Sequence, residues 1–349
     1  MRAVSQNYYA TYGADATGNI TVSPLSAALC MAMVANSCDD ASAQKMADVL
    51  YCDDLEALNT LSNKLIRFLS HKQDIIVSLA NSVWYNKWVT VDPGYGQSMF
   101  DTFYAPVQSA DFSLQSTVDL INSWAGEKTN GMIPRVIDQI DPTSVVIWAN
   151  AMYAAGEWNA PFDPKDTGRA MFNGRDMRNV VDMMESDAKF EFYGNTQFSA
   201  VRLPFKGNGA SMIFILPDEG VTVDQLLESL SAENFDQMRA SWKRDQMIVR
   251  LPKFDIAQKA DLNEAYRALG VPGAVKYTFI STPDAGGVTT WQCARIMVDE
   301  HGAKAAAVTV SDLCTAPMPS ILTFDRPFLY FFCDDSTGTI LLSGRVCNL

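Results

Sequence analysis

Two long apolar runs constrain the fold more than any other feature of this sequence. Residues 75–85 (IIVSLANSVWY) and 145–153 (VVIWANAMY) are rich in β-branched and aromatic residues and almost continuously apolar. A run of this kind predicts a central β-strand that is covered on both faces, rather than a strand with one face in water. Such strands need other elements above and below their sheet, so we expect a large core.

Helical and strand patterns surround these runs. Three helices are predicted before the first strand: one that begins at Ser23-Pro24, a second near residue 40 and a third over residues 55–69. After residue 199 short strands dominate, and the chain ends in a predicted hairpin, residues 328–346. No repeat and no linker rich in Pro, Gly or Ser divides the 349 residues. We therefore predict one mixed α+β domain with large sheets.

The overall composition disfavours several kinds of partner. The chain is 48% hydrophobic and 19% charged, which is ordinary for a soluble globular protein. Its net charge of −13 disfavours nucleic acid and anionic membrane surfaces as partners. No uninterrupted apolar run reaches the roughly 20 residues that a membrane span needs, and the first residues lack the apolar region of a signal peptide.

The titratable residues argue against an enzyme. The chain has two histidines, His71 and His301, and a Ser-His-Asp or Cys-His arrangement needs one of them as its base. His71 lies at the polar end of a predicted helix, and His301 precedes a glycine in an acidic turn. The seven cysteines are scattered without a Cys-x-x-Cys pair, which predicts mostly buried, reduced thiols and neither a metal site nor a cofactor. Cys314 is the exception, because its polar, Pro-rich surroundings predict exposure.

One segment fits two structures. Residues 303–312 (AKAAAVTVSD) are compatible with a short helix, because Ala is the best helix former. They are also compatible with a strand, because every second residue from 303 to 311 is small and no proline removes a backbone N–H before residue 317. Pro317 and Pro319 then end either element. From these residues alone both interpretations stay open.

Short motifs along the whole chain resemble those of the serpin family. They are NITVSPLS (19–26), LAN (79–81), INSW (121–124) with TNG (129–131), NAMY (150–153) with GEW (156–158), LPKF (251–254), DEHGAKAA (299–306), FDRPF (324–328), TGTI (337–340) and GRV (344–346). Because their order and spacing extend over essentially all 349 residues, the chain is identified as a member of this family. The short N-terminus and the unpaired cysteines suggest a prokaryotic-like or compact member.

The resemblance implies a fold and a mechanism. The fold is a single α+β serpin domain over residues 1–349, with three β-sheets, eight to nine α-helices and an exposed reactive-centre loop at about residues 302–321. The function is irreversible, suicide-substrate inhibition of a serine protease, which cleaves the loop and is held as a covalent acyl complex when the loop enters the central sheet. The alternatives are a non-inhibitory serpin (carrier, storage or chaperone), a protein that is only a protease substrate, and an unrelated hydrolase.

The resemblance also assigns the hinge of the inserting segment. Its residues are Glu300, Gly302, Ala303, Lys304, Ala305, Ala306, Ala307, Val308 and Thr309. The positions implied to face inward are small and uncharged, as in inhibitory members: Ala303, Ala305, Ala307 and Thr309. Lys304 is implied to face outward, where a charge is tolerated. These residues favour inhibition over a non-inhibitory role.

Proline decides our choice of the scissile bond. Family spacing from Gly302 places the bond after Ala316, but Pro317 follows, and its fixed ring makes proline a poor residue on the leaving side. We therefore predict cleavage at Thr315–Ala316, with Cys314–Thr315 as the next candidate. Each choice places a small, uncharged residue in the main specificity pocket of the protease, which favours elastase-like or subtilisin-like targets.

A second set of residues is implied to control the opening of the central sheet. It comprises Asn19, Ser23, Ser26, Asn150, Trp158, Lys253 and Gln292. Gln292 stands where the family usually has histidine, and we expect its amide to hydrogen-bond Asn150 or Ser23. Lys253 is implied to pair with Glu300 near Trp158. That pair is either an exposed one of little energetic value or a control on loop entry.

The remaining expectations concern partners and location. Lys64, Arg67 and Lys72 are dispersed in the third predicted helix, so we expect no heparin site. The sequon at Asn19 belongs to a motif expected to be buried, so we expect no glycan there. The resemblance implies a monomer that is extracellular or located at the cell surface.

Overall fold

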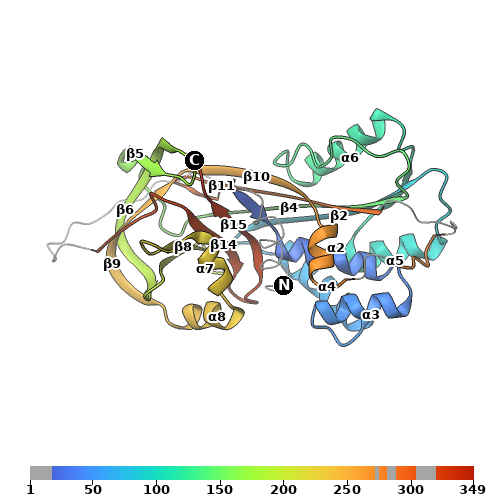
Figure 1. Cartoon of the computed structure of the whole chain (residues 1–349), viewed down its shortest axis with the longest axis horizontal. Helices are drawn as coiled ribbons and strands as arrows, with labels where there is room; N and C mark the ends of the chain where they lie inside the picture. The colour runs from blue at the N-terminus through green and yellow to red at the C-terminus, as the bar shows by residue number, and fades with distance from the viewer. Residues whose placement is uncertain (1–17, 272–274, 281–287, 304–319) are drawn as a thin grey trace.

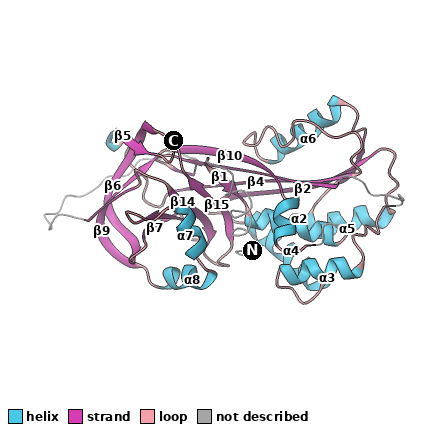
Figure 2. Cartoon of the chain, viewed as in Figure 1, coloured by secondary structure: helices cyan, strands magenta, loops and turns pink. Residues whose placement is uncertain are grey.

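The computed structural model describes residues 18–271, 275–280, 288–303 and 320–349. Within these ranges it contains eight α-helices and fifteen β-strands, which confirms the predicted α+β class (Figures 1 and 2). The helices are α2 (Pro24–Ala35), α3 (Asp40–Val49), α4 (Leu55–Ser70), α5 (Pro93–Phe103), α6 (Gln115–Lys128), α7 (Val223–Ser229), α8 (Ala232–Ala240) and α9 (Asn263–Ala268). No helix in the described ranges is long and apolar enough to cross a membrane.

The two predicted central strands are neighbours in a six-stranded sheet. The strand order is β10-β11-β4-β2-β3, and β12 pairs with the end of β4. The bounds are β2 (Ile76–Asn86), β3 (Val107–Ala110), β4 (Val146–Glu157), β10 (Phe254–Asp261), β11 (Val288–Val298) and β12 (Gly302–Ala303). Strand β4 is buried at every position except Glu157, as expected of a strand covered on both faces.

Helices cover both faces of this sheet. On one face Trp84 and Ile147 pack with Ile121 of α6 in one apolar cluster. On the other face Val83 and Trp148 belong to the main core, which includes buried residues of α2, α4 and α5. Figure 1 shows α6 on one side of β2 and β4, and α2, α4 and α5 on the other. Because helices cover both faces of these strands, nearly all of their residues are apolar.

Local sequence signals define the start of helix α2. Ser23 is its N-cap, and the Ser23 hydroxyl accepts a hydrogen bond of 3.1 Å from the backbone N–H of Ser26. Pro24 follows at the first helical position, where a missing N–H costs nothing. The helix is buried at every residue except one, so its N-terminus is held inside the molecule beneath the central sheet.

The remaining strands form one nine-stranded sheet. Its order is β1-β15-β14-β8-β7-β6-β9-β13, with β5 paired to β6. The bounds are β1 (Ile20–Val22), β5 (Gly168–Asn173), β6 (Arg178–Gly194), β7 (Phe198–Pro204), β8 (Ala210–Pro217), β9 (Lys243–Pro252), β13 (Ser320–Thr323), β14 (Phe328–Asp334) and β15 (Ile340–Val346). The expected terminal hairpin is β14 with β15.

The number of hydrogen-bonded sheets differs from the expected three. The described strands join into two, because the 17-residue strand β6 takes part in two groups of strands. Its first part pairs with β5 and β9, and its last residues pair with β7, which leads on to β8, β14 and β15. One continuous strand, β6, thus joins two groups of strands into one sheet. The sequence does not predict this connection.

Candidate functional site

The centre of the six-stranded sheet contains a junction between two parallel strands. Strand β11 runs parallel to β4 from the pair Val288–Val146 to the pair Arg295–Tyr153, whereas β10 and β2 flank them in antiparallel orientation. We call these paired segments the β4–β11 junction. Because β4 and β11 pair directly, no other strand lies between them over these eight pairs.

Beyond the junction the chain turns back toward β4. Strand β11 continues to Val298 against β10 alone. A tight turn follows, in which the backbone N–H of Asp299 donates to Gly302 at 3.0 Å and the N–H of Gly302 donates to Asp299 at 3.3 Å. Strand β12 then pairs antiparallel with Glu157 and Gly156 at the end of β4. Two of the predicted hinge residues, Gly302 and Ala303, therefore lie at the open end of the junction.

Glycine is required at the first hinge position. Gly302 has a φ of +150°, and a β-carbon there would lie 2.9 Å from the α-carbon of Glu157 and closer still to the carbonyl oxygen of Gly156. Gly156 is equally confined, because its own β-carbon would lie 2.7 Å from the ring of Phe205. Gly302 thus allows β12 to approach β4, and Gly156 allows Phe205 to pack against β4 at the same point.

Trp158 holds the turn at the end of β11. Its indole N–H donates to the carbonyl oxygen of Asp299 at 3.0 Å. Its backbone N–H donates to the carbonyl oxygen of His301 at 3.0 Å. The indole is 1% exposed and stacks on the ring of Phe205 with a centroid distance of 4.8 Å. The structure therefore places Trp158 in direct contact with the hinge.

The predicted pair between Lys253 and Glu300 forms beside the same turn. The ammonium group of Lys253 lies 2.9 and 3.1 Å from the two carboxylate oxygens, and the Thr167 hydroxyl donates to Glu300 at 2.8 Å. Glu300 is 6% exposed. Burial would raise the pKa of this carboxyl, but the hydrogen bonds from Lys253 and Thr167 outweigh it and hold the pKa below its usual value. The pair is therefore half-buried, with its carboxylate inside the protein and the Lys253 side chain 37% exposed.

Gln292 joins the central sheet to the start of α2. Its side chain is 1% exposed; the amide oxygen accepts from the N–H of Ser23 at 3.1 Å, and the amide nitrogen donates to the carbonyl oxygen of Ser23 at 2.7 Å. Of the two expected partners, Gln292 thus binds Ser23. Both bonds are to the Ser23 backbone, which leaves the Ser23 hydroxyl to cap α2.

Asn150 lies opposite Gln292 in the register but binds elsewhere. Its amide nitrogen donates to the side-chain oxygen of Asn81 at 2.6 Å, and Asn81 in turn donates to the carbonyl oxygen of Phe103 at 3.1 Å. The side-chain oxygens of Asn150 and Ser26 are buried and have no hydrogen-bond partner among the described residues. Asn81, part of the LAN motif, is therefore an additional member of this buried group.

The structure does not bring Asn19 into the group. Its amide donates to the carbonyl oxygen of Asn348 at 2.6 Å and accepts from the backbone N–H groups of Cys347 and Asn348. Asn19 thus attaches the start of the described chain to its C-terminus. It is half-buried, whereas the three residues of β1 that follow it are all buried.

A long loop crosses the β4–β11 junction. Residues 129–145 connect α6 to β4, and we call them the α6–β4 loop. Asp138 in this loop forms an ion pair with Lys259 on β10, whose ammonium group also lies 5.1 Å from the ring centroid of Trp291. The carbonyl oxygen of Met132 accepts from Arg295 on β11 at 2.9 Å. Sequence analysis did not identify these contacts, because they join segments far apart in the chain.

Other predicted residues lie outside the described ranges. They are Lys304, Ala305, Ala306, Ala307, Val308, Thr309, Cys314, Thr315, Ala316 and Pro317. The described cysteines are all free, and burial raises the pKa of most of them, that of Cys293 to about 11. Within the described ranges no group of three His, Cys, Asp or Glu residues is arranged to hold a metal ion.

Comparison with known families agrees with this geometry. The family model described as Serpin (serine protease inhibitor) matches residues 2–349. The chain belongs to the serpin family. Serpins are generally protease inhibitors rather than catalytic enzymes, and the family description gives serine proteases as the class of partner.

Relatives of this serpin cover most of its length. Iripin-2 of Ixodes ricinus is 27% identical and aligns with 95% of this chain and 88% of its own. An uncharacterized serpin-like protein of Thermococcus kodakarensis is also 27% identical, over 95% of this chain and 80% of its own. The crystal structure of the thermophilic serpin Tengpin in the native state is 27% identical, with a TM-score of 0.89, and covers 100% of this chain and 92% of that one. This serpin therefore has prokaryotic relatives.

Proposed function

We propose that this serpin is an irreversible suicide-substrate inhibitor of serine proteases that inserts its cleaved reactive-centre loop into the β4–β11 junction. The observation that carries the proposal is the position of β12. It pairs antiparallel with the end of β4, directly at the open end of the junction. A strand that continued from β12 along β4 would be antiparallel to both β4 and β11.

The energetics favour such an insertion. The present junction is one parallel ladder of eight register pairs. A new strand would replace it with two antiparallel ladders, and each additional hydrogen bond contributes about 0.5–1.5 kcal/mol net. Strands β10 and β11 would move away from β4 by about 4.8 Å to admit the strand. Insertion over this length therefore supplies on the order of 10 kcal/mol, enough to drive displacement of an attached protease.

The residues near the hinge suit an inserting strand. Ala303 is already 2% exposed where β12 meets β4, and Ala305, Ala307 and Thr309 would follow it on the same side. Small side chains cost little to enter a packed sheet, whereas Lys304 would face the opposite side. Insertion is then fast enough to precede hydrolysis of the acyl-enzyme.

The bait sequence supports a protease that prefers small residues. We propose cleavage at Thr315–Ala316 by an elastase-like or subtilisin-like protease, because no Arg or Lys occurs from 305 to 325 and Pro317 disfavours the bond after Ala316. The inhibitor would act as a monomer, in a covalent acyl complex, outside the cell or at its surface. It would need no cofactor, heparin, nucleic acid or membrane.

The test is incubation with neutrophil-type elastase, subtilisin and trypsin, followed by denaturing gels and sequencing of the released C-terminal peptide. We expect an SDS-resistant complex with elastase or subtilisin and a new N-terminus at Ala316. Clean cleavage without complex across a broad protease panel would show a non-inhibitory serpin or a substrate. A new N-terminus at Pro317 or elsewhere would refute the proposed bond.

A further inference from the structure

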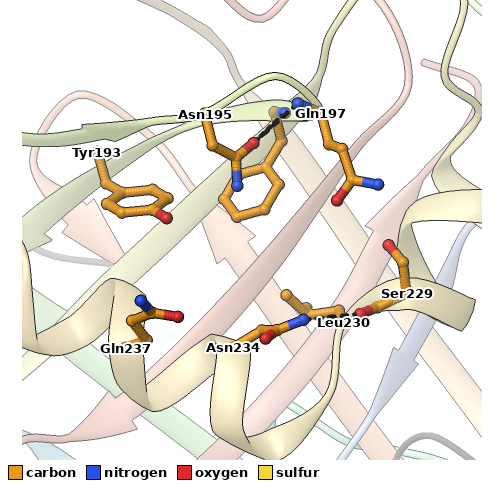
Figure 3. Close-up of a pocket in the computed structure, with 8 residues that line it drawn as sticks. Tyr193, Asn195, Gln197, Ser229, Leu230, Asn234 and Gln237 are labelled. Carbon is orange, nitrogen blue, oxygen red and sulfur yellow. Dashed lines mark hydrogen bonds between the residues drawn. The ribbon is translucent and has the colours of Figure 1, made fainter.

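A small hollow lies beside the nine-stranded sheet, whereas the β4–β11 junction belongs to the six-stranded sheet. It has a volume of about 140 Å³ and lies between the β6–β7 turn and the α7–α8 connection (Figure 3). Tyr193 at the end of β6 and Asn195 and Gln197 in the turn line one side of it. Ser229, Asn234 and Gln237 line it from the helices. None of the residues that control the hinge takes part in it.

Both walls of the hollow are held by their own hydrogen bonds. Asn195 closes the β6–β7 turn, because its side-chain oxygen accepts from the backbone N–H of Gln197 at 2.8 Å and of Phe198 at 3.0 Å. On the opposite side the amide of Asn234 donates to the carbonyl oxygen of Ser229 at 3.2 Å. The buried side chains of Phe198 and Leu230 form the apolar floor. The hollow is therefore built in advance of any ligand.

Several polar groups in the hollow have no partner within the described chain. The carboxamides of Gln197 and Gln237 and the hydroxyl of Tyr193 make no hydrogen bond with another described residue. Figure 3 shows these three side chains directed into the space between turn and helices. A carboxamide both donates and accepts hydrogen bonds, and so does a phenolic hydroxyl. The hollow thus offers donors and acceptors together.

The chemistry of the lining selects the class of ligand. All eight lining residues are uncharged; a cation site would need carboxylates, and an anion site would need Arg or Lys. An apolar ligand would remove water from the carboxamides without replacing their hydrogen bonds. A ligand with several neutral hydroxyl groups satisfies both donors and acceptors, and its C–H face can pack on the ring of Tyr193.

We propose that this hollow binds one neutral sugar ring. Its volume is below the roughly 300–1,000 Å³ typical of sites for larger organic ligands, so it suits a single ring and not an oligosaccharide chain. The net charge of −13 also disfavours an acidic sugar. The site is independent of protease inhibition, because none of its residues belongs to the hinge or the β4–β11 junction.

The test uses protein labelled with fluorotyrosine, in which the Tyr193 resonance is assigned by its loss in Tyr193→Phe. The intact protein is titrated with the methyl glycosides of glucose, galactose, mannose and N-acetylglucosamine, up to about 100 mM because a lone ring binds weakly. We expect at least one glycoside to shift the Tyr193 resonance in a saturable way. Free reducing sugars form a second series, which distinguishes a free ring from the capped ring of a glycan.

The control variants locate the binding. Gln197→Ala and Gln237→Ala each remove an exposed carboxamide, and we expect each to weaken binding about threefold to tenfold. Gln97→Ala, an exposed glutamine on α5, should leave the affinity unchanged. The proposal is overturned if no glycoside shifts Tyr193, if the double variant Gln197→Ala with Gln237→Ala binds as well as the parent protein, or if gluconate binds as tightly as the neutral sugars.

Discussion

Gly302 lies so close to Gly156 that a β-carbon on Gly302 would collide with the carbonyl oxygen of Gly156. This contact sets where the chain leaves the turn after β11 and where β12 joins β4. Both the φ of +150° and the lack of space exclude a side chain at position 302. A residue other than glycine there would therefore break the contact between β12 and β4.

Replacing Gly302 by alanine should displace β12. We expect Gly302→Ala to lower the free energy of unfolding by about 1–3 kcal/mol, because the change adds a steric clash to an unfavourable φ. Urea denaturation of the native protein measures the effect. Gly168→Ala is the matched control, since a β-carbon at Gly168 meets nothing within 4 Å; equal destabilisation by the two variants would contradict the proposed role of Gly302.

The Lys253–Glu300 pair should make stability depend on pH. The folded pKa of Glu300 lies below its usual value, so its contribution is complete above the unfolded glutamate pKa of about 4.3 and is lost as the pH falls through the lower folded pKa. We expect Lys253→Met to lower the free energy of unfolding by about 1–2 kcal/mol at neutral pH. The difference between the variant and the parent should shrink as the pH falls below about 4.

The measurement for this pair is a series of urea denaturation curves from pH 7 down to pH 3. Lys206→Met provides a comparison, because Lys206 pairs with Glu157 at a site where both side chains are more exposed. A Lys253→Met effect that stays constant over the whole pH range would rule out the Glu300 carboxylate as its cause.

Gln292 should contribute more to the free energy of unfolding than Gln258, which binds strand β1. Gln292→Leu keeps the volume but leaves the N–H of Ser23 unpaired in the core. It also removes one of two hydrogen bonds to the Ser23 carbonyl oxygen, which still accepts from the N–H of Ala27, so we expect a cost of about 1–3 kcal/mol. Gln258→Leu removes one bond, to the N–H of Thr21, from a half-buried side chain. We expect a smaller loss there, and calorimetry or urea denaturation of both variants tests the order.

The ion pair between Asp138 and Lys259 should slow loop insertion. It attaches the α6–β4 loop to β10 across the β4–β11 junction, so separating the strands with the loop in place would have to break it. We expect Asp138→Asn to raise the fraction of molecules that trap the protease relative to those that are merely cleaved. Densitometry of complex and cleaved bands gives this ratio.

Asp141→Asn is the control for this prediction. Asp141 lies in the same loop, but its described contacts are hydrogen bonds from Thr143. An equal change in both variants would mean that the effect arises from altered charge and not from the contact with Lys259. Because the prediction rests on insertion, it is measured with a protease that forms complexes with the parent protein.

A charge on the inward side of the inserting segment should convert the inhibitor into a substrate. In Ala305→Arg a long cationic side chain would have to enter the packed sheet, where burying an unpaired charge is costly. We expect normal cleavage but no SDS-resistant complex, whereas Lys304→Arg should retain the complex because residue 304 would face outward. Complex formation by Ala305→Arg at the parent rate would argue against insertion.

Much of the local structure follows from short-range patterns. The start of α2 at Pro24 follows from Ser23 and the proline, and the burial of β4 follows from its unbroken apolar run. Strand β6 was not predicted, because its residues alternate irregularly between buried and exposed as the strand passes from one group of strands to another. Helix α5 was also missed; its glycines weaken the helical pattern, while Tyr95, Met99 and Phe103 pack into the core.

The sequence by itself determined the family, the central strands and the small residues Gly302 and Ala303 that follow the turn after β11. Those features depend on residue type and on neighbours a few positions away. Only the tertiary structure decided that β4 and β11 lie side by side, that Gln292 binds the backbone of Ser23 and that Asp138 reaches Lys259. Such contacts join residues more than a hundred positions apart, and packing of the whole chain selects them among many partners of equal local chemistry.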